Sequence, residues 1–172
     1  VKAAMEQHYQ KYPDGPVNVG RIEFIERYPA RGGVPPYSMF EMRGGDLKHA
    51  IIVLVEEKSK TDLRVDWEAF AEFKDELLWD FLNKPGSAPG KFRVMIRRRH
   101  SFDKDMPDLA RKEAFELSQP GTNATANVYA IKGAAAARSL ARQLAWGDAI
   151  AATVQLVWHG EGDTRWVEVK AV

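Results

Sequence analysis

Residues 84–90 read KPGSAPG, a stretch with two prolines and two glycines. Such a run continues neither a helix nor a central strand, because proline lacks a backbone N–H and clashes with the preceding turn. We therefore predict two units, residues 1–83 and 91–172, joined by a linker over residues 84–90. Since this linker is short and stiffened by proline, we expect the two units to pack on one another.

Charge differs on the two sides of this linker. The chain of 172 residues has a net charge of +1, but residues 1–86 sum to −3 and residues 87–172 to +4. Because the net charge of the whole chain is close to zero, it does not indicate a protein that binds nucleic acid or another polyanion. A composition with 45% hydrophobic and 28% charged residues is typical of a folded globular chain. Because the chain has no cysteine, it has no disulfide, thiolate zinc site or cysteine nucleophile.

The first unit reads as a leading helix followed by strands. Met5, Tyr9 and Tyr12 share one face of a helix that begins at Lys2. The strand-like runs after it are separated by short turn segments, which favour antiparallel hairpins over helical crossovers. The sequence therefore predicts an antiparallel meander with strands over Val17–Tyr28, Tyr37–Met42, His49–Glu57 and Leu63–Val65.

The third of these strands is apolar on both sides. Ile51, Val53 and Val55 point to one face, and Ile52 and Leu54 point to the other. We therefore expect it to lie centrally in the sheet, with both faces covered.

A bridging helix is predicted over Trp67–Asn83. Asp66 is suited to be its N-cap, because a carboxylate there accepts hydrogen bonds from the first-turn amides. An apolar stripe runs from Phe70 to Phe81 at helical spacing. Trp79 lies off this stripe, so we expect the helix to be wedged between the two units.

The second unit reads as a mixed β-sheet with one helix. Phe92, Val94 and Ile96 alternate with polar residues, as in a half-buried strand. Trp158 and Trp166 bracket a predicted hairpin, a placement suited to cross-strand aromatic contact. Strands are predicted over Phe92–Arg99, Ala114–Ser118, Ala126–Lys132, Ala152–His159 and Arg165–Val172, and a helix over Ala134–Trp146. The fold class is therefore α+β.

Residues 1–83 resemble the small cystatin-like and NTF2-like α+β domains of uncharacterised bacterial proteins. The resemblance is carried by the leading helix, the antiparallel meander and the short sequence Val65-Asp66-Trp67-Glu68. It implies a curved sheet around a helix and no particular activity, because these folds host enzymes, ligand binders and assembly modules alike. No catalytic residues are carried over, and the remainder of the chain resembles no family.

Weak ligand-binding candidates line the expected concave side of the meander. His49, Asp66, Tyr37 and Glu41, together with Arg21, could form a pocket in which a carboxylate and an imidazole are tuned for proton transfer. The alternative is structural, since Asp66 is explained as a helix cap and His49 as a residue at a strand end.

Weak anion-binding candidates are four arginines of the second unit. If Arg97 and Arg99 converge with Arg138 and Arg142, they would form a basic patch for phosphate or carboxylate groups. The alternative is that arginines on a strand point to water, or pair with the acidic first unit.

Metal and cofactor motifs are weak or absent in the sequence. The four histidines lack the three- or four-residue spacing of a helical zinc pair. The loop His100–Asp108 holds an imidazole and three carboxylates, but lacks the glycine and closing glutamate of a calcium loop. No phosphate-binding glycine motif or nucleophile elbow occurs. We therefore expect no cofactor, no metal and no catalytic residue.

The sequence favours a non-catalytic binding or assembly module of a bacterial protein, with a protein partner or a second copy of the chain as partner. One alternative is a small-ligand binder or enzyme with a pocket in the first unit, and another is an anion or nucleic-acid binder. The longest apolar run, Ala50–Val55, is far shorter than the ~20 residues of a membrane helix. The sequence leaves the location open. Because the chain begins at Val1 and not at a methionine, an export signal or anchor could precede it, and the location would then be extracytoplasmic.

Overall fold

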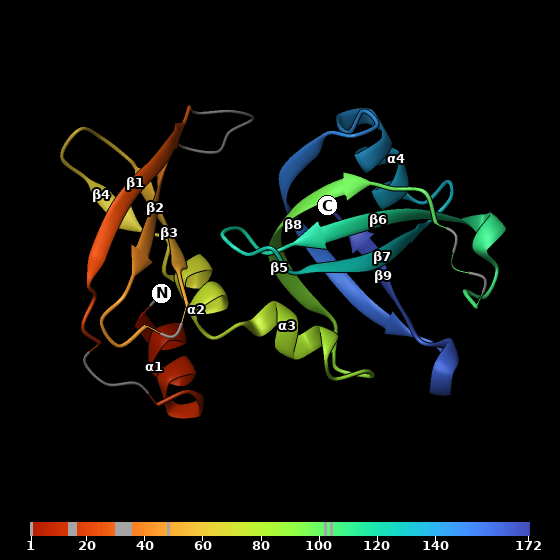
Figure 1. Cartoon of the computed structure of the whole chain (residues 1–172), viewed down its shortest axis with the longest axis horizontal. Coiled ribbons are helices and arrows are strands. Elements are labelled where there is room, and N and C mark those ends of the chain that lie inside the picture. The colour runs from red at the N-terminus through yellow and green to blue at the C-terminus, as the bar shows by residue number, and fades with distance from the viewer. Residues whose placement is uncertain (1, 14–16, 30–35, 48, 102, 104) are drawn as a thin grey trace. The chain divides into compact units, whose positions relative to one another are not determined.

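The computed structural model describes residues 2–13, 17–29, 36–47, 49–101, 103 and 105–172. The chain divides into two compact units, Val1–Leu77 and Leu78–Val172. The first holds a four-stranded antiparallel sheet with helices, and the second holds a closed five-stranded barrel with helices (Figure 1). The predicted α+β class is therefore confirmed.

The first unit is the predicted meander. A leading helix, α1 (Lys2–Lys11), precedes strands that pair antiparallel in the order β1-β2-β3-β4. A β-bulge in β1 lies between Phe24 and Glu26. The strands are β1 (Arg21–Tyr28), β2 (Tyr37–Arg43), β3 (Ile51–Glu57) and β4 (Leu63–Val65).

The core of this unit lies between the sheet and α2 (Trp67–Lys74). Ile51 and Ile52 of β3 are buried against Ala69 and Phe73 of α2. The leading helix is held to the same region by its aromatic side: the imidazole of His8 lies 5.3 Å from the Trp67 ring, edge to face. His8 Nε2 also lies 2.7 Å from Asp75 Oδ2.

The bridging helix predicted over residues 67–83 is two helices in the structure. It is interrupted after α2, where Glu76 has a left-handed backbone with φ 52°, and α3 (Leu77–Leu82) follows. Phe81 of α3 packs against Phe92 of the barrel, with ring centroids 5.1 Å apart. Trp158 Nε1 donates to the Phe81 carbonyl oxygen at 3.0 Å. These contacts explain why the chain divides between Leu77 and Leu78, with the KPGSAPG stretch inside the second unit.

The second unit is a barrel in which strands follow the order β5-β6-β7-β9-β8, and β8 pairs back with β5. The pairs are antiparallel except β7 with β9, which are parallel. Closure of the sheet was not predicted from the sequence. The strands are β5 (Gly90–Arg98), β6 (Lys112–Ser118), β7 (Thr125–Ile131), β8 (Ala149–His159) and β9 (Trp166–Ala171).

The interior of the barrel is filled by the alternate residues of its strands. The predicted inward row Phe92, Val94 and Ile96 is buried, which confirms the alternation in β5. Leu140 of α4 (Ala135–Gln143) is fully buried, because this helix packs on β7 and β9. The short 3-10 turns η1 (Leu109–Arg111) and η2 (Gly162–Thr164) connect strands. Among the helices of the described residues, none has the length and apolar character to cross a membrane.

Candidate functional site

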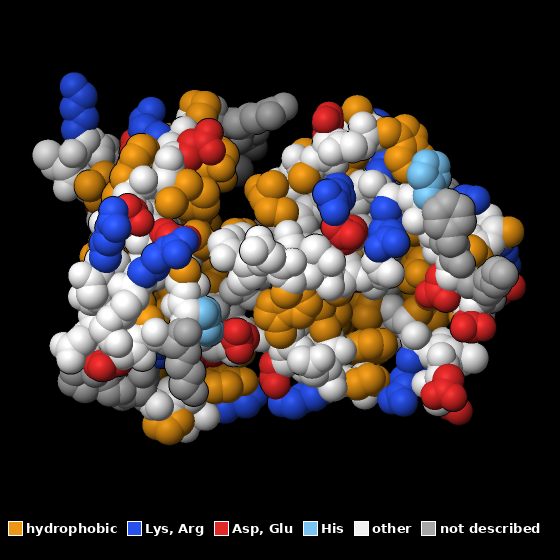
Figure 2. Space-filling model, in the orientation of Figure 1, with side chains coloured by type: hydrophobic (Ala, Val, Ile, Leu, Met, Phe, Trp, Pro, Cys, Tyr) orange, Lys and Arg blue, Asp and Glu red, His pale blue; other side chains and the backbone are white. Residues whose placement is uncertain are grey.

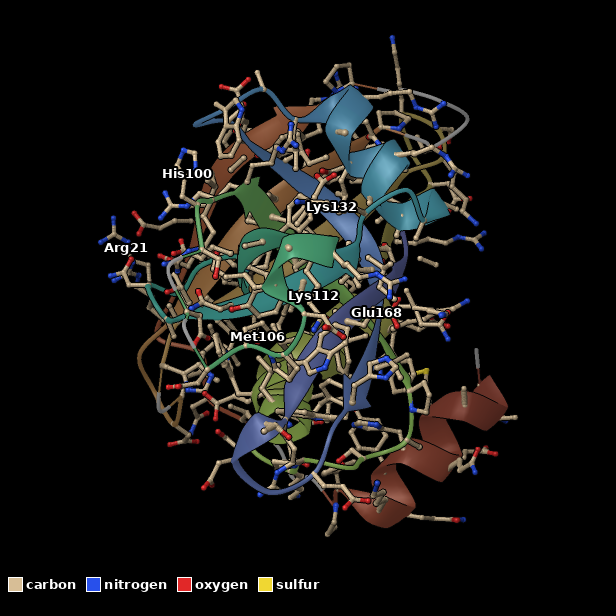
Figure 3. The ribbon with its side chains drawn as sticks, turned by 90° about the vertical axis from the view of Figure 1, so that its right-hand side faces the viewer. Arg21, His100, Met106, Lys112, Lys132 and Glu168 are labelled. Carbon is tan, nitrogen blue, oxygen red and sulfur yellow. The ribbon has the colours of Figure 1, made fainter. Side chains whose placement is uncertain are left out.

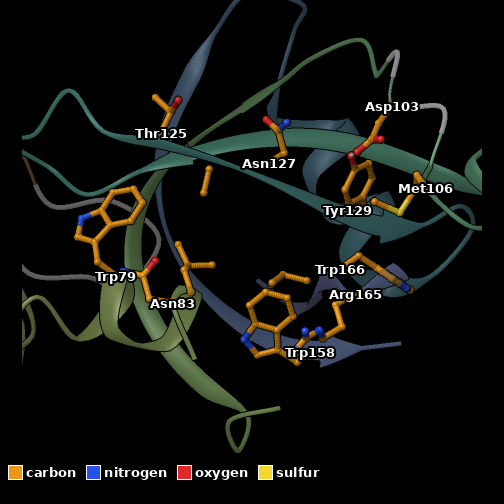
Figure 4. A pocket seen from close by; sticks show the side chains of 13 residues that line it. Trp79, Asn83, Asp103, Met106, Thr125, Asn127, Tyr129, Trp158, Arg165 and Trp166 are labelled. Atoms are coloured by element: carbon orange, nitrogen blue, oxygen red, sulfur yellow. Dashed lines mark hydrogen bonds between the residues drawn. The ribbon is translucent and has the colours of Figure 1, made fainter. Parts of the chain in front are cut away.

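A hollow of about 360 Å³ lies on the side of the barrel (Figure 4). Its volume falls in the range of roughly 300–1,000 Å³ that is usual for ligand pockets. Its lining residues come from α3 and the residue after it, from β7, β8 and β9, and from the two loops that follow β5 and β8. Its lining is Trp79, Leu82, Asn83, Asp103, Met106, Thr125, Ala126, Asn127, Tyr129, Trp158, Arg165, Trp166 and Val167.

Three tryptophans and one tyrosine dominate this lining. Trp79 and Trp158 are half-buried, and Trp158 is oriented by its hydrogen bond to the Phe81 carbonyl. Trp166 stacks on His159, with ring centroids 4.7 Å apart, and meets Tyr129 edge to face at 6.2 Å. The predicted cross-strand contact between Trp158 and Trp166 is therefore replaced by one between His159 and Trp166. The reason is the register of β8 and β9, which sets His159 opposite Trp166.

Two charged groups of opposite sign face the hollow. Asp103 Oδ2 accepts a hydrogen bond of 3.2 Å from the hydroxyl of Tyr129, and Asp103 Oδ1 accepts one of 3.3 Å from the Asp105 backbone N–H. Arg165 Nε donates to the Gly162 carbonyl oxygen at 2.6 Å. Burial raises the pKa of Tyr129, and the Asp103 charge adds to this rise, so Tyr129 is a hydrogen-bond donor at neutral pH.

The loop that carries Asp103 and Met106 is anchored to the barrel by a buried lysine. The ammonium of Lys112, at the start of β6, donates to the Pro107 carbonyl oxygen and lies 4.1 Å from the Trp166 ring centroid (Figure 3). Burial lowers the pKa of Lys112, and the nearby charge of Asp108 partly opposes this shift. Lys112 is thus a positioning residue for one wall of the hollow.

The ligand candidates predicted in the first unit each have a different partner. Tyr37 stacks on Tyr28 with centroids 4.8 Å apart, and the buried Glu41 accepts a hydrogen bond from Arg43. Asp66 caps α2 by accepting from the Ala69 N–H at 3.0 Å. His49 precedes β3, and its Nδ1 lies 3.8 Å from the exposed carboxylate of Glu76.

These contacts support structural roles for the first-unit candidates. Arg21, also considered for this pocket, pairs with Glu23 on its own strand. In the contacts given above, each candidate has a different partner, and none of these partners is another candidate.

The four candidate arginines fall into two groups. Arg97 and Arg99 both pair with Glu116 on the neighbouring strand β6, and Arg99 also donates to the Asn127 side-chain oxygen beside the hollow. Arg138 and Arg142 are exposed on α4, where Arg138 donates to the Gly133 carbonyl oxygen. The partner of Arg97 and Arg99 is thus an acidic residue of their own unit.

No gathering of three or more histidine, aspartate or glutamate side chains suited to a metal ion occurs in the described part of the chain. Lys104 and Phe102, which belong to the acidic loop considered for a cation, lie outside the described residues.

Sequence reasoning missed most of the hollow. Its residues come from segments far apart in the chain, and their types are those of ordinary packing and polar surface. One signal was present, since Trp158 and Trp166 flank one hairpin and the polar loop after β5 carries Asp103. The contribution of α3 depends on how this helix packs, which no local pattern shows.

The barrel is similar in architecture to one known class of small barrels. The five-stranded Greek-key barrel of OB-folds binds its ligands over the second and third strands and the loops after the first and fourth strands. Here the hollow involves the third strand of the barrel, β7, and both corresponding loops. Comparison of the chain with protein-family models, with curated proteins and with solved structures gives no match.

Proposed function

We propose that this chain is a non-catalytic binding module whose ligand occupies the aromatic hollow of the second unit. The observation that carries the proposal is the lining itself, in which aromatic side chains surround a few convergent polar groups. Concave sites of this composition are the usual places of small-ligand binding. The topology supports the same place, although a fold alone does not assign a function.

The charges of the lining favour an uncharged, polar ligand. Asp103 would repel an anion and Arg165 would repel a cation, and together they give the hollow no net charge. Among the described residues, the side-chain amide of Asn83 and the terminal nitrogens of Arg165 have no hydrogen-bond partner, so they are free to bind a ligand. A sugar ring fits this set, because its C–H face packs on an aromatic plane and its hydroxyls both donate and accept.

A second candidate is a single-stranded nucleic acid, and one observation favours it. Arg99 reaches Asn127 at the border of the hollow, and Arg97 lies on the same side of β5. Aromatic side chains beside a basic strip are the usual combination for single strands. Glu116 between these arginines and Asp103 in the hollow reduce the attraction for phosphate, so we place the sugar first.

The test is calorimetric titration of the chain with maltohexaose, cellohexaose and chitohexaose, and separately with oligothymidylate. We expect at least one saccharide to bind, and the variants Trp79→Ala and Asn83→Ala to weaken its binding at least tenfold. Trp146→Ala is the matched control, because Trp146 is 56% exposed and lies outside the hollow.

Saccharide binding that is equal in all variants would contradict the proposal, as would the absence of saccharide binding. Binding of oligothymidylate that is lost in the variant Arg97→Gln or Arg99→Gln would establish the second candidate instead. Far-ultraviolet circular dichroism confirms that each variant is folded.

We further infer that the first unit belongs with the cystatin-like and NTF2-like domains of bacterial proteins. The leading helix and the meander in sequence order support this kinship. The corresponding partner is a protein or a second copy of the chain, and an export signal or anchor before this segment would place it outside the cytoplasm. Detection of the protein in an extracytoplasmic fraction tests that location.

A further inference from the structure

The aromatic side chains of the hollow differ in how much of each ring a ligand can reach. The Lys112 ammonium lies 4.1 Å from the Trp166 ring centroid, and the His159 ring is stacked on the same indole at 4.7 Å. Lys112 belongs to β6 and His159 to β8, which lie on opposite sides of β9 in the strand order. Both faces of the Trp166 indole are therefore covered, and this ring offers the hollow only an edge.

Two further rings of the lining are also held by contacts inside the barrel unit. Tyr129 is 3% exposed, and its hydroxyl donates to the Asp103 carboxylate. The indole of Trp158 donates to the Phe81 carbonyl oxygen, and its ring lies tilted beside the Phe81 ring, with centroids 6.1 Å apart. These two rings form part of the wall of the hollow.

Trp79 differs from these rings, because no other ring covers it. Among the described residues its indole has neither a ring contact nor a hydrogen-bond partner, and the side chain is half-buried. Hydrophobic side chains also gather at the surface of the barrel beside α3 (Figure 2). Trp79 is thus the ring of the lining whose face is open to a ligand.

Asn83 extends this open surface. Its backbone N–H donates to the Trp79 carbonyl oxygen at 2.9 Å, so the last turn of α3 continues to Asn83. Residues four apart on a helical turn share one face, which places the Asn83 amide beside the Trp79 indole. The two side chains form an aromatic end of the hollow with a polar group next to it.

The charged groups of the hollow lie away from Trp79. Figure 4 shows Trp79 and Asn83 at one end, and Asp103 with Trp166 at the other. At this second end the Asp103 carboxylate accepts hydrogen bonds. The terminal nitrogens of Arg165 donate, and they have no partner in the part of the chain that the structure describes. The hollow therefore has a stacking end and a hydrogen-bonding end.

We propose that the hollow holds a saccharide of at least two sugar units, one stacked on Trp79 and another hydrogen-bonded by Asp103 and Arg165. This inference rests on the proposed function and specifies its ligand as an oligosaccharide. A single sugar ring contacts only one of the two ends, because they lie on opposite sides of the hollow (Figure 4). Binding both ends therefore requires a chain of sugars.

The two ends have different roles in the choice of ligand. An aromatic face packs on the C–H face of many pyranoses, so stacking on Trp79 contributes affinity with little selectivity. A site that hydrogen-bonds a hydroxyl rejects a ligand that lacks it, because the polar groups of the site are then left unpaired. Asp103 and Arg165 are therefore the residues that distinguish one sugar from another.

Calorimetric titration with saccharides of increasing length tests this inference. The series run from glucose to maltohexaose, from glucose to cellohexaose, and from N-acetylglucosamine to chitohexaose. In the series that binds, we expect the affinity to rise at least tenfold from the monosaccharide to the trisaccharide. Trp79→Ala should reduce this gain to less than twofold, whereas Trp79→Phe should keep most of it.

Two further variants separate the two ends. Arg165→Gln should lower the affinity for every chain length by a similar factor and so preserve the gain with length. Trp146→Ala is the control, because it removes a 56% exposed indole that lies outside the hollow. Trp79→Leu keeps an apolar side chain on α3 without an aromatic plane, and it replaces Trp79→Ala if circular dichroism shows that variant to be unfolded.

The outcomes distinguish this inference from the proposed function. A monosaccharide that binds as tightly as the longer members of its series overturns the two-unit ligand and leaves the binding function standing. A gain with length that persists in both Trp79→Ala and Trp79→Leu also overturns it. If no saccharide of any length binds, the proposed function is wrong, and the present inference is rejected with it.

Discussion

The hydroxyl of Tyr129, a residue that is 3% exposed, donates to the carboxylate of Asp103 in the loop after β5. Through this bond a buried strand residue holds a loop residue at the wall of the hollow. The variant Tyr129→Phe keeps the ring and removes the bond, so we expect a loss of about 1 kcal/mol in the free energy of unfolding. Urea unfolding of Tyr129→Phe beside the wild-type chain measures this loss.

The same substitution bears on ligand binding. If the hollow is the site, Tyr129→Phe weakens binding of a saccharide ligand without changing the secondary structure, because Asp103 loses the bond that orients it. Equal affinity of Tyr129→Phe and the wild-type chain would show that the position of Asp103 does not matter to the ligand.

Lys112 provides a second test of how this loop is held. Lys112→Met keeps most of the aliphatic stem but removes the ammonium that bonds to the Pro107 carbonyl and lies over the Trp166 ring. We expect a loss of about 1–3 kcal/mol in stability, the combined size of a cation–π contact and a hydrogen bond. We also expect faster amide hydrogen exchange at Asp105, Met106 and Asp108. Unchanged exchange there would contradict the anchoring role.

Asp66 is predicted to stabilise α2 as its N-cap. Asp66→Ala removes the acceptor for the Ala69 N–H, and it should cost about 1 kcal/mol, within the range of 0.5–2 kcal/mol for N-caps. Asp66→Ser restores a capping oxygen and should recover most of that stability in thermal unfolding. If Asp66→Ser is as unstable as Asp66→Ala, the carboxylate charge rather than the cap is what stabilises α2.

Tyr28 should make the first unit sensitive to alkali. Burial raises the pKa of Tyr28 to about 12 from the ordinary value of 10.0, and a hydrogen bond and the charge of Glu26 add to this rise. Because the folded state releases this proton later than the unfolded state, its contribution to stability is complete below pH 10 and is lost between about pH 10 and 12. Urea unfolding across this pH window should show a smaller decline for Tyr28→Phe than for the wild-type chain.

Local pattern was enough for most of the helices and strands of this protein, but not for the division of the bridging helix into α2 and α3. Three predicted features depend only on neighbours a few residues away, and each is present in the structure. They are the alternation of Phe92, Val94 and Ile96, the short turns between the first strands, and the capping carboxylate of Asp66. The break at Glu76 was not predicted, because this residue is not a glycine and yet has a left-handed backbone. The KPGSAPG stretch was a reasonable place to divide the chain, but the contacts of Phe81 with Phe92 and Trp158 assign α3 to the barrel.

The sequence by itself determined the α+β class, the order of its strands and helices and the two-sided apolar character of β3. Only the tertiary structure decided that the second sheet closes, because closure depends on the pairing of β5 with β8, whose residues are distant in the chain. The same holds for the hollow, which joins Trp79, Asp103 and Trp166 from three separate segments. The periodicity of side chains in the sequence indicates on which face of a strand or helix a residue lies. A site depends in addition on which residues, distant in the chain, the tertiary packing brings to that face.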